Sequence, residues 1–211
     1  MHIYAFGSIC RGDVTVGSDI DLLAVTEGED PRFDRDTYSI YSYNRLRELW
    51  REGNPFAWHL SLESRLLFSE DGTDFLRTLG TPCPYLRALA DCEKFANLFC
   101  AARDSIHAGS NSPIFELSTI FLAIRNFATC FSLGLTDRPN FSRRAALHLG
   151  SDSLDIDPST FNTLERARLL STRGAGIAPI EDELHRVVLS FETIDNWMNG
   201  LRERARSYER V

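Results

Sequence analysis

The chain has 211 residues and a mass of 23.9 kDa, a length that suits two small domains better than one compact domain. Its composition, 43% hydrophobic and 25% charged, excludes a largely disordered chain, and no apolar heptad is sustained as in a coiled coil. The net charge of −7 argues against non-specific binding of duplex DNA, which needs a basic excess.

No uninterrupted apolar run approaches about 18 residues, and the start, Met1-His2-Ile3-Tyr4, lacks the pattern of a signal peptide. We therefore expect no membrane span and a cytoplasmic protein. The five cysteines are an odd number without C-x-x-C spacing, which is typical of free thiols in a reducing compartment.

The first 80 residues have the pattern of an α/β domain. Strands are expected at residues 1–9, 20–25, 38–43 and 56–62. In the third of these, Tyr38 and Ile40 are expected to face the core. A helix is expected from Asn44, as its N-cap, through Arg51, with Gly53 as its stop.

Residues 81–211 carry no convincing strand pattern and are predicted to form an all-α bundle. Helices are expected at residues 85–107, 114–133, 142–149, 158–170 and 179–206. Ser112 and Pro113 have the residue types of a helix start, and Gly134 that of a helix stop.

A strand that ends in Gly7-Ser8 is followed ten residues later by a strand that opens with Asp19-Ile20-Asp21. Gly7 lets a ligand approach the backbone, and Ser8 adds a hydroxyl suited to phosphate oxygens. Two residues apart on a strand, Asp19 and Asp21 are expected to share one face, with Ile20 turned into the core.

Two carboxylates this close repel each other unless a cation lies between them. Mg²⁺ takes few carboxylates together with phosphate oxygens. We therefore predict that Asp19 and Asp21 bind Mg²⁺ and are catalytic, with a nucleoside triphosphate as substrate and ATP as the expected nucleotide.

Several segments resemble the signature of the DNA polymerase β-like nucleotidyltransferase superfamily, above all its minimal bacterial members. They are Gly7-Ser8, Arg11-Gly12 and Ser18-Asp19-Ile20-Asp21-Leu22-Leu23. The resemblance covers about residues 1–80 and implies an α+β domain, a small mixed sheet with helices. It also implies Mg²⁺-dependent transfer of a nucleoside monophosphate to an acceptor hydroxyl, with Gly7, Ser8, Arg11 and Ser18 at the nucleotide.

Active members of that superfamily add a third carboxylate on the strand before the second helix. Asp36 is closest in sequence, and Glu63, which shares an expected strand face with His59 and Ser61, is the other candidate. We favour Asp36 as the third catalytic residue because its strand should lie beside that of Asp21. Glu63 stays a candidate contact to acceptor or phosphate, and His59 is expected on a sheet face.

The helical half resembles the substrate-binding domains of antibiotic nucleotidyltransferases and the related HEPN bundles, mostly through residues 123–128. Arg125 lies in the most apolar expected helix, where a lone arginine needs an anionic partner. Two interpretations stay open: an internal salt bridge to Glu116 or Asp195, or a contact to acceptor or phosphate. A HEPN ribonuclease would need a histidine where Cys130 stands.

The leading hypothesis is therefore transfer of a nucleoside monophosphate to a hydroxyl of a small molecule or a protein. The alternative is a catalytically lapsed nucleotide-binding or partner-binding module of a toxin–antitoxin or defence system. This alternative is considered because the third expected strand, residues 38–43, carries no carboxylate. The expected partners are the triphosphate and an unidentified acceptor, and the chain is also a candidate homodimer.

Overall fold

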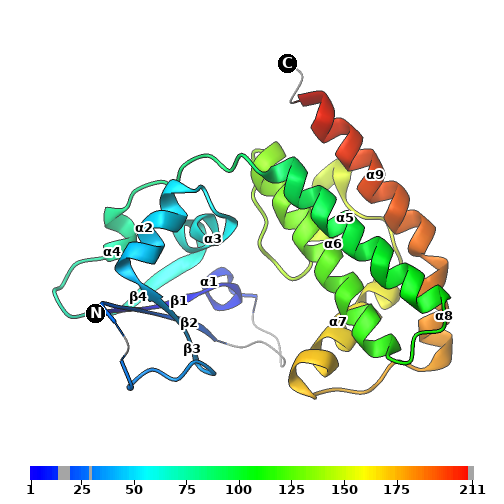
Figure 1. Cartoon of the computed structure of the whole chain (residues 1–211), viewed down its shortest axis with the longest axis horizontal. Helices are drawn as coiled ribbons and strands as arrows, with labels where there is room; N and C mark the ends of the chain where they lie inside the picture. The colour runs from blue at the N-terminus through cyan, green and yellow to red at the C-terminus, as the bar shows by residue number, and fades with distance from the viewer. Residues whose placement is uncertain (14–19, 29, 209–211) are drawn as a thin grey trace. The chain divides into compact units, whose positions relative to one another are not determined.

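The computed structural model describes residues 1–13, 20–28 and 30–208, with only the backbone of residues 207 and 208. The chain divides into two compact units, Met1–Leu86 and Arg87–Val211, which are coloured blue to green and green to red in Figure 1. An α+β unit is followed by a mostly helical one, so the predicted fold class is confirmed.

The first unit is built on a mixed sheet with the strand order β3-β2-β1-β4. Its strands are β1 (His2–Phe6), β2 (Asp21–Thr26), β3 (Tyr38–Ser42) and β4 (Ser64–Ser69). β1 is antiparallel to both β2 and β4, whereas β3 runs parallel to β2. The first three strands lie where the sequence predicted them, except that β1 ends at Phe6 and gives way to a helical turn.

Helices cover one face of this sheet (Figure 1). They are α2 (Tyr43–Arg51), α3 (Pro55–Glu63) and α4 (Phe75–Thr78), while the short α1 (Ser8–Arg11) follows β1. The core between them is apolar: Tyr4 and Leu23 of the sheet pack with Leu46, Trp50 and Leu60 of the helices. Burial of such side chains is the main stabilising contribution in a unit of this size.

The predicted strand at 56–62 is wrong, because these residues form α3. Asn54 caps the helix, its Oδ1 accepting a hydrogen bond from the Phe56 amide at 2.8 Å, and Pro55 occupies the first turn. Ala57 and Leu60 are buried at helical spacing. These start signals prevail over the apolar alternation, and the strand lies just beyond, as β4.

Two further details of the first unit differ from expectation. Ser42, not Asn44, caps α2, its side chain accepting a hydrogen bond from the Arg45 amide. Tyr41 packs against the core beneath the helices, so Tyr38 and Ile40 lie on the opposite face of β3. The strand's alternation was predicted correctly, but its orientation was reversed.

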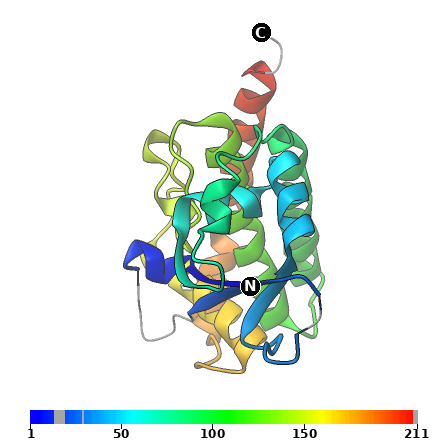
Figure 2. The same cartoon turned by 90° about the vertical axis from the view of Figure 1, so that its left-hand side faces the viewer.

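In the second unit, long helices run side by side in both views (Figure 1 and Figure 2). The helices are α5 (Ala88–His107), α6 (Pro113–Leu135), α7 (Pro158–Arg173), α8 (Glu181–Leu189) and α9 (Phe191–Tyr208), with the short η1 (Ala145–Leu147) and η2 (Gly150–Asp152). Fully buried aromatic residues fill the core, among them Phe99, Phe127, Phe131 and Phe161.

Three predicted boundaries in this unit are wrong. The single helix expected at 179–206 is two helices that meet at Ser190, and the helix expected at 142–149 is reduced to the single 3₁₀ turn η1. α6 continues through Gly134 to Leu135, because buried residues hold its last turns.

By length and composition alone, α6 could cross a membrane. However, 56% of its most apolar stretch is buried within the unit, where it packs against α5 and α7. The core helix of a globular domain meets the same criteria, and this burial favours that interpretation of α6.

The cap of α3 can be tested by substitution. Asn54→Ala removes the acceptor for the Phe56 amide and should lower the free energy of unfolding by about 1 kcal/mol. Asn44→Ala is the matched control: Asn44 is exposed inside α2, so we expect a change within about 0.5 kcal/mol. Urea unfolding followed by tryptophan fluorescence measures both, and equal losses would contradict the assigned caps.

Candidate active site

The turn after β1 depends on a glycine. Gly7 has φ 76° and ψ −138°, a conformation that other residues adopt only with strain. A Cβ atom at this position would lie 2.8 Å from Oδ2 of Asp21. The missing side chain therefore lets the carboxylate of β2 come up against the end of β1.

Asp21 is the first residue of β2 and pairs across the sheet with Phe6. Because residues two apart share a face, Asp21 lies on the same side as Leu23 and Val25, which are buried in the core. The expectation that Ile20 turns into the core is wrong, since its side chain is 59% exposed. Asp21 is an exposed carboxylate at the margin of the helix-covered face.

Two other predicted residues, Ser18 and Asp19, lie outside the described part of the chain. Their proximity to Asp21 therefore stays a prediction. Among the described residues, no group of three or more His, Cys, Asp or Glu side chains is arranged to hold a metal ion.

The end of α3 brings a second carboxylate to the turn. The Gly7 amide donates a hydrogen bond of 3.1 Å to the backbone carbonyl of Glu63. Oε2 of Glu63 contacts the Arg11 guanidinium of α1, and Arg11 Nε also donates to Asp13 at 2.9 Å. Arg11 and Glu63 thus join the turn after β1 to the last turn of α3.

His59 completes this group, although the sequence placed it on a sheet face. It lies one helical turn before Glu63, with its Nε2 3.0 Å from the carboxylate Oε2. Its Cε1 is 3.8 Å from the point that a Gly7 Cβ would occupy, the same point that lies beside Asp21. Sequence reasoning missed His59 because the i, i+4 relation to Glu63 exists only in a helix.

Asp36 precedes β3 and is exposed, its amide donating to Asp34 Oδ1 at 3.1 Å. β3 runs parallel to β2 with Tyr38 opposite Leu22. The amino ends of both strands therefore lie at the same edge of the sheet, and Asp36 belongs to the edge that holds Asp21. This strand register alone does not place the carboxylates of Asp36 and Asp21 in contact.

The remaining residues of the turn contribute structure. Ser8 is half-buried, and its carbonyl accepts a hydrogen bond from the Asp13 amide at 3.0 Å. Burial raises the pKa of the Cys10 thiol, which donates to the Ala5 carbonyl. Cys10 therefore lacks the lowered pKa of a nucleophilic cysteine.

Arg125 belongs to the second unit, on α6, where its Nη2 donates to the Phe141 carbonyl at 3.4 Å. The acids predicted as its partners have other contacts: Glu116 accepts from Ser105, and Asp195 pairs with Arg103. Its predicted role at acceptor or phosphate stays a prediction.

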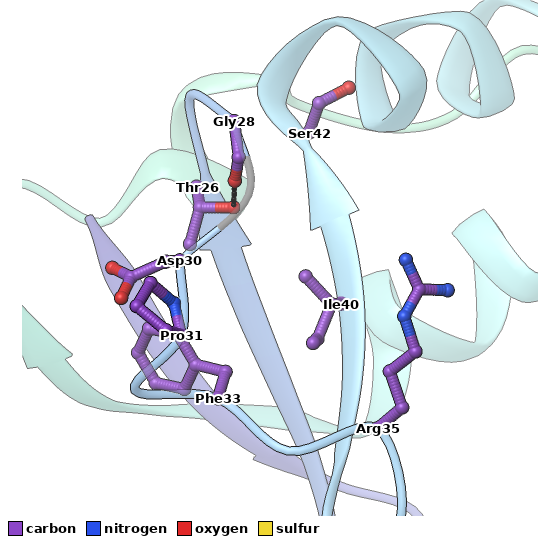
Figure 3. Close-up of a pocket in the computed structure, with 8 residues that line it drawn as sticks. All are labelled: Thr26, Gly28, Asp30, Pro31, Phe33, Arg35, Ile40 and Ser42. Carbon is purple, nitrogen blue, oxygen red and sulfur yellow. Dashed lines mark hydrogen bonds between the residues drawn. The ribbon is translucent and has the colours of Figure 1, made fainter.

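A cavity of about 550 Å³ lies elsewhere in the first unit (Figure 3). Thr26 and Ser42, the last residues of β2 and β3, line it, together with the apolar Phe33 and Ile40 and the guanidinium of Arg35. Asp21 is at the opposite end of β2, so this cavity is separate from the Gly7 turn.

Comparison with known families finds a similarity in the first unit. Residues 2–73 match the sequence model of the family described as "Nucleotidyltransferase domain". The matched segment begins at β1 and ends beyond β4, so it contains Gly7, Asp21, Asp36, His59 and Glu63. No protein in the curated set matches the chain.

The close approach at Gly7 yields a stability prediction. Gly7→Ala adds backbone strain and a contact with Asp21, so it should lower the free energy of unfolding by about 1–3 kcal/mol. Gly12→Ala is the matched control, because Gly12 has a similar φ of 79° with nothing within 4 Å of its Cβ position.

Denaturant unfolding of the single and double variants separates the two causes. The loss in Gly7→Ala should exceed that in Gly12→Ala, and it should shrink in an Asp21→Ala background, where the obstructing carboxylate is gone. Equal losses at the two glycines, or a loss in Gly7→Ala that Asp21→Ala leaves unchanged, would contradict the assigned contact.

Proposed function

We propose, from the match of residues 2–73 to the nucleotidyltransferase domain family, that the chain transfers a nucleoside monophosphate from a nucleoside triphosphate, with ATP as the nucleotide, to an acceptor hydroxyl. The observation that carries the proposal is the approach of the Asp21 carboxylate to the side-chain-free Gly7 turn. The sequence motif has two parts, a turn expected to bind phosphate and a carboxylate expected to bind a metal ion. These two parts, the Gly7 turn and Asp21, thus lie side by side.

The residues at this edge fit Mg²⁺. Asp21 offers an exposed oxygen ligand, and Mg²⁺ takes few protein ligands when phosphate oxygens and water supply the rest. Asp21, together with Asp19, would hold the ion, which neutralises charge on the triphosphate when bound. We assign Asp36, at the same sheet edge, as the third carboxylate.

The triphosphate would lie along the turn after β1. Gly7 leaves room for a phosphate to approach the backbone, and the Ser8 hydroxyl can donate to a phosphate oxygen. Arg11 supplies a guanidinium that suits bidentate phosphate contacts, and Ser18 is assigned to the nucleotide by the motif. These residues bind and orient the nucleotide for in-line attack by the acceptor oxygen.

The acceptor is a hydroxyl of a small molecule or a protein, and we assign its binding to the helical unit, with Arg125 as a candidate contact. A second function is favoured by one observation: β3, Tyr38–Ser42, carries no acidic residue. The chain would then be a catalytically lapsed nucleotide-binding or partner-binding module of a toxin–antitoxin or defence system.

Transfer is tested with each of the four nucleoside triphosphates, radiolabelled at the α-phosphorus, with Mg²⁺ and a cell lysate as acceptor source. Label should move to a protein or a small molecule, and Asp21→Asn should slow this at least about 100-fold. Glu27→Gln is the control, because Glu27 is an exposed acid just beyond the other end of β2.

Undiminished labelling by Asp21→Asn would refute its role. If the wild-type chain binds Mg²⁺·ATP in calorimetry but labels nothing with any nucleotide, the result supports the catalytically lapsed binding module and contradicts the enzyme.

Asp36→Asn tests the third carboxylate in the same assay. We expect a loss of at least about 100-fold in rate with an unchanged unfolding midpoint, because Asp36 is exposed and its side chain supports no core contact. Activity equal to that of Glu27→Gln would remove Asp36 from the catalytic set.

A further inference from the structure

His59 and Glu63 form a shielded pair beside the proposed site. Their side chains are only 15% and 13% exposed, and Nε2 of His59 lies 3.0 Å from Oε2 of Glu63. A neutral imidazole has one ring nitrogen that can accept a proton.

The ring is also held in place and aimed at the turn. It packs edge-on against Phe6, with ring centroids 5.7 Å apart and an interplanar angle of 79°. Its Cε1, the carbon between the two ring nitrogens, lies 3.8 Å from the point that a Gly7 Cβ would occupy, and Oδ2 of Asp21 is 2.8 Å from the same point. The imidazole edge and the carboxylate thus converge where the nucleotide is proposed to bind.

Glu63 is the less suitable proton acceptor of the pair. Its Oε2 accepts a hydrogen bond from the Arg11 guanidinium and also lies 3.0 Å from Nε2 of His59. The Arg11 guanidinium also forms an ion pair with Asp13, at 2.9 Å. This arrangement makes Glu63 a positioning residue, which orients the imidazole.

We infer that His59 is a further catalytic residue, which accepts the proton of the acceptor hydroxyl; this rests on the proposed function. The hydroxyl oxygen attacks the α-phosphorus and forms the new O–P bond. The bond from the α-phosphorus to the bridging oxygen breaks, and pyrophosphate leaves with the electron pair. The hydroxyl proton moves to the unprotonated ring nitrogen of His59, and the nearby Glu63 carboxylate stabilises the imidazolium.

The test uses the full chain in the label-transfer assay, with the acceptor fraction that the wild type labels. His59→Gln retains an amide that can donate to Glu63 but cannot take a proton. We expect kcat to fall at least about 100-fold while KM for the triphosphate stays within about threefold. His148→Ala, at an exposed histidine of the helical unit, is the control and should keep wild-type kcat.

Chemical rescue separates catalysis from packing. Added imidazole should restore part of the rate of His59→Ala but none of the rate of Asp21→Asn. Wild-type kcat in His59→Gln, or a His59→Ala variant that folds and gains nothing from imidazole, would overturn the inference and leave nucleotide transfer standing. Should the wild type transfer no label, the proposed function itself fails. If His59→Ala does not fold, the kcat of His59→Gln decides.

Discussion

The candidate site depends on the absence of one side chain. At Gly7 the backbone adopts a conformation reserved for glycine, which ends β1 and lets the Asp21 carboxylate stand within contact distance of the turn. The Gly7 amide also donates to the Glu63 carbonyl, so the same residue fixes the end of α3. Three elements that are distant in sequence thereby place their polar ends at one edge of the sheet.

The charges around this turn form a connected set. Arg11 bridges Asp13 and Glu63, and Glu63 in turn faces His59. Because Glu63 and His59 are mostly shielded from water, their interaction is stronger than that of an exposed pair. The set holds its members in place before any ligand binds, as the proposed proton transfer to His59 would require.

Much of the first unit was predictable from sequence, and the failures have physical causes. Strands β2 and β3 were visible as apolar or alternating runs, and the Gly-Ser and Asp-x-Asp pattern located the turn and Asp21. Residues 56–62 alternate like a strand, but Asn54 and Pro55 start a helix there. That error concealed the relation of His59 to Glu63. The face of Asp21 was also assigned wrongly, since only the pairing of β1 with β2 reveals it.

The location of the proposed nucleotide site can be measured directly by NMR, with paramagnetic Mn²⁺ in place of the proposed Mg²⁺. We predict that Mn²⁺ added together with ATP broadens the resonances of Gly7, Ser8 and Asp21 and of the His59 ring, while those of Thr26 and Ser42, at the other ends of β2 and β3, stay sharp. Mn²⁺ without nucleotide should broaden them far less, because the protein alone supplies few ligands. Broadening at Thr26 and Ser42, or none at the Gly7 turn, would contradict the account.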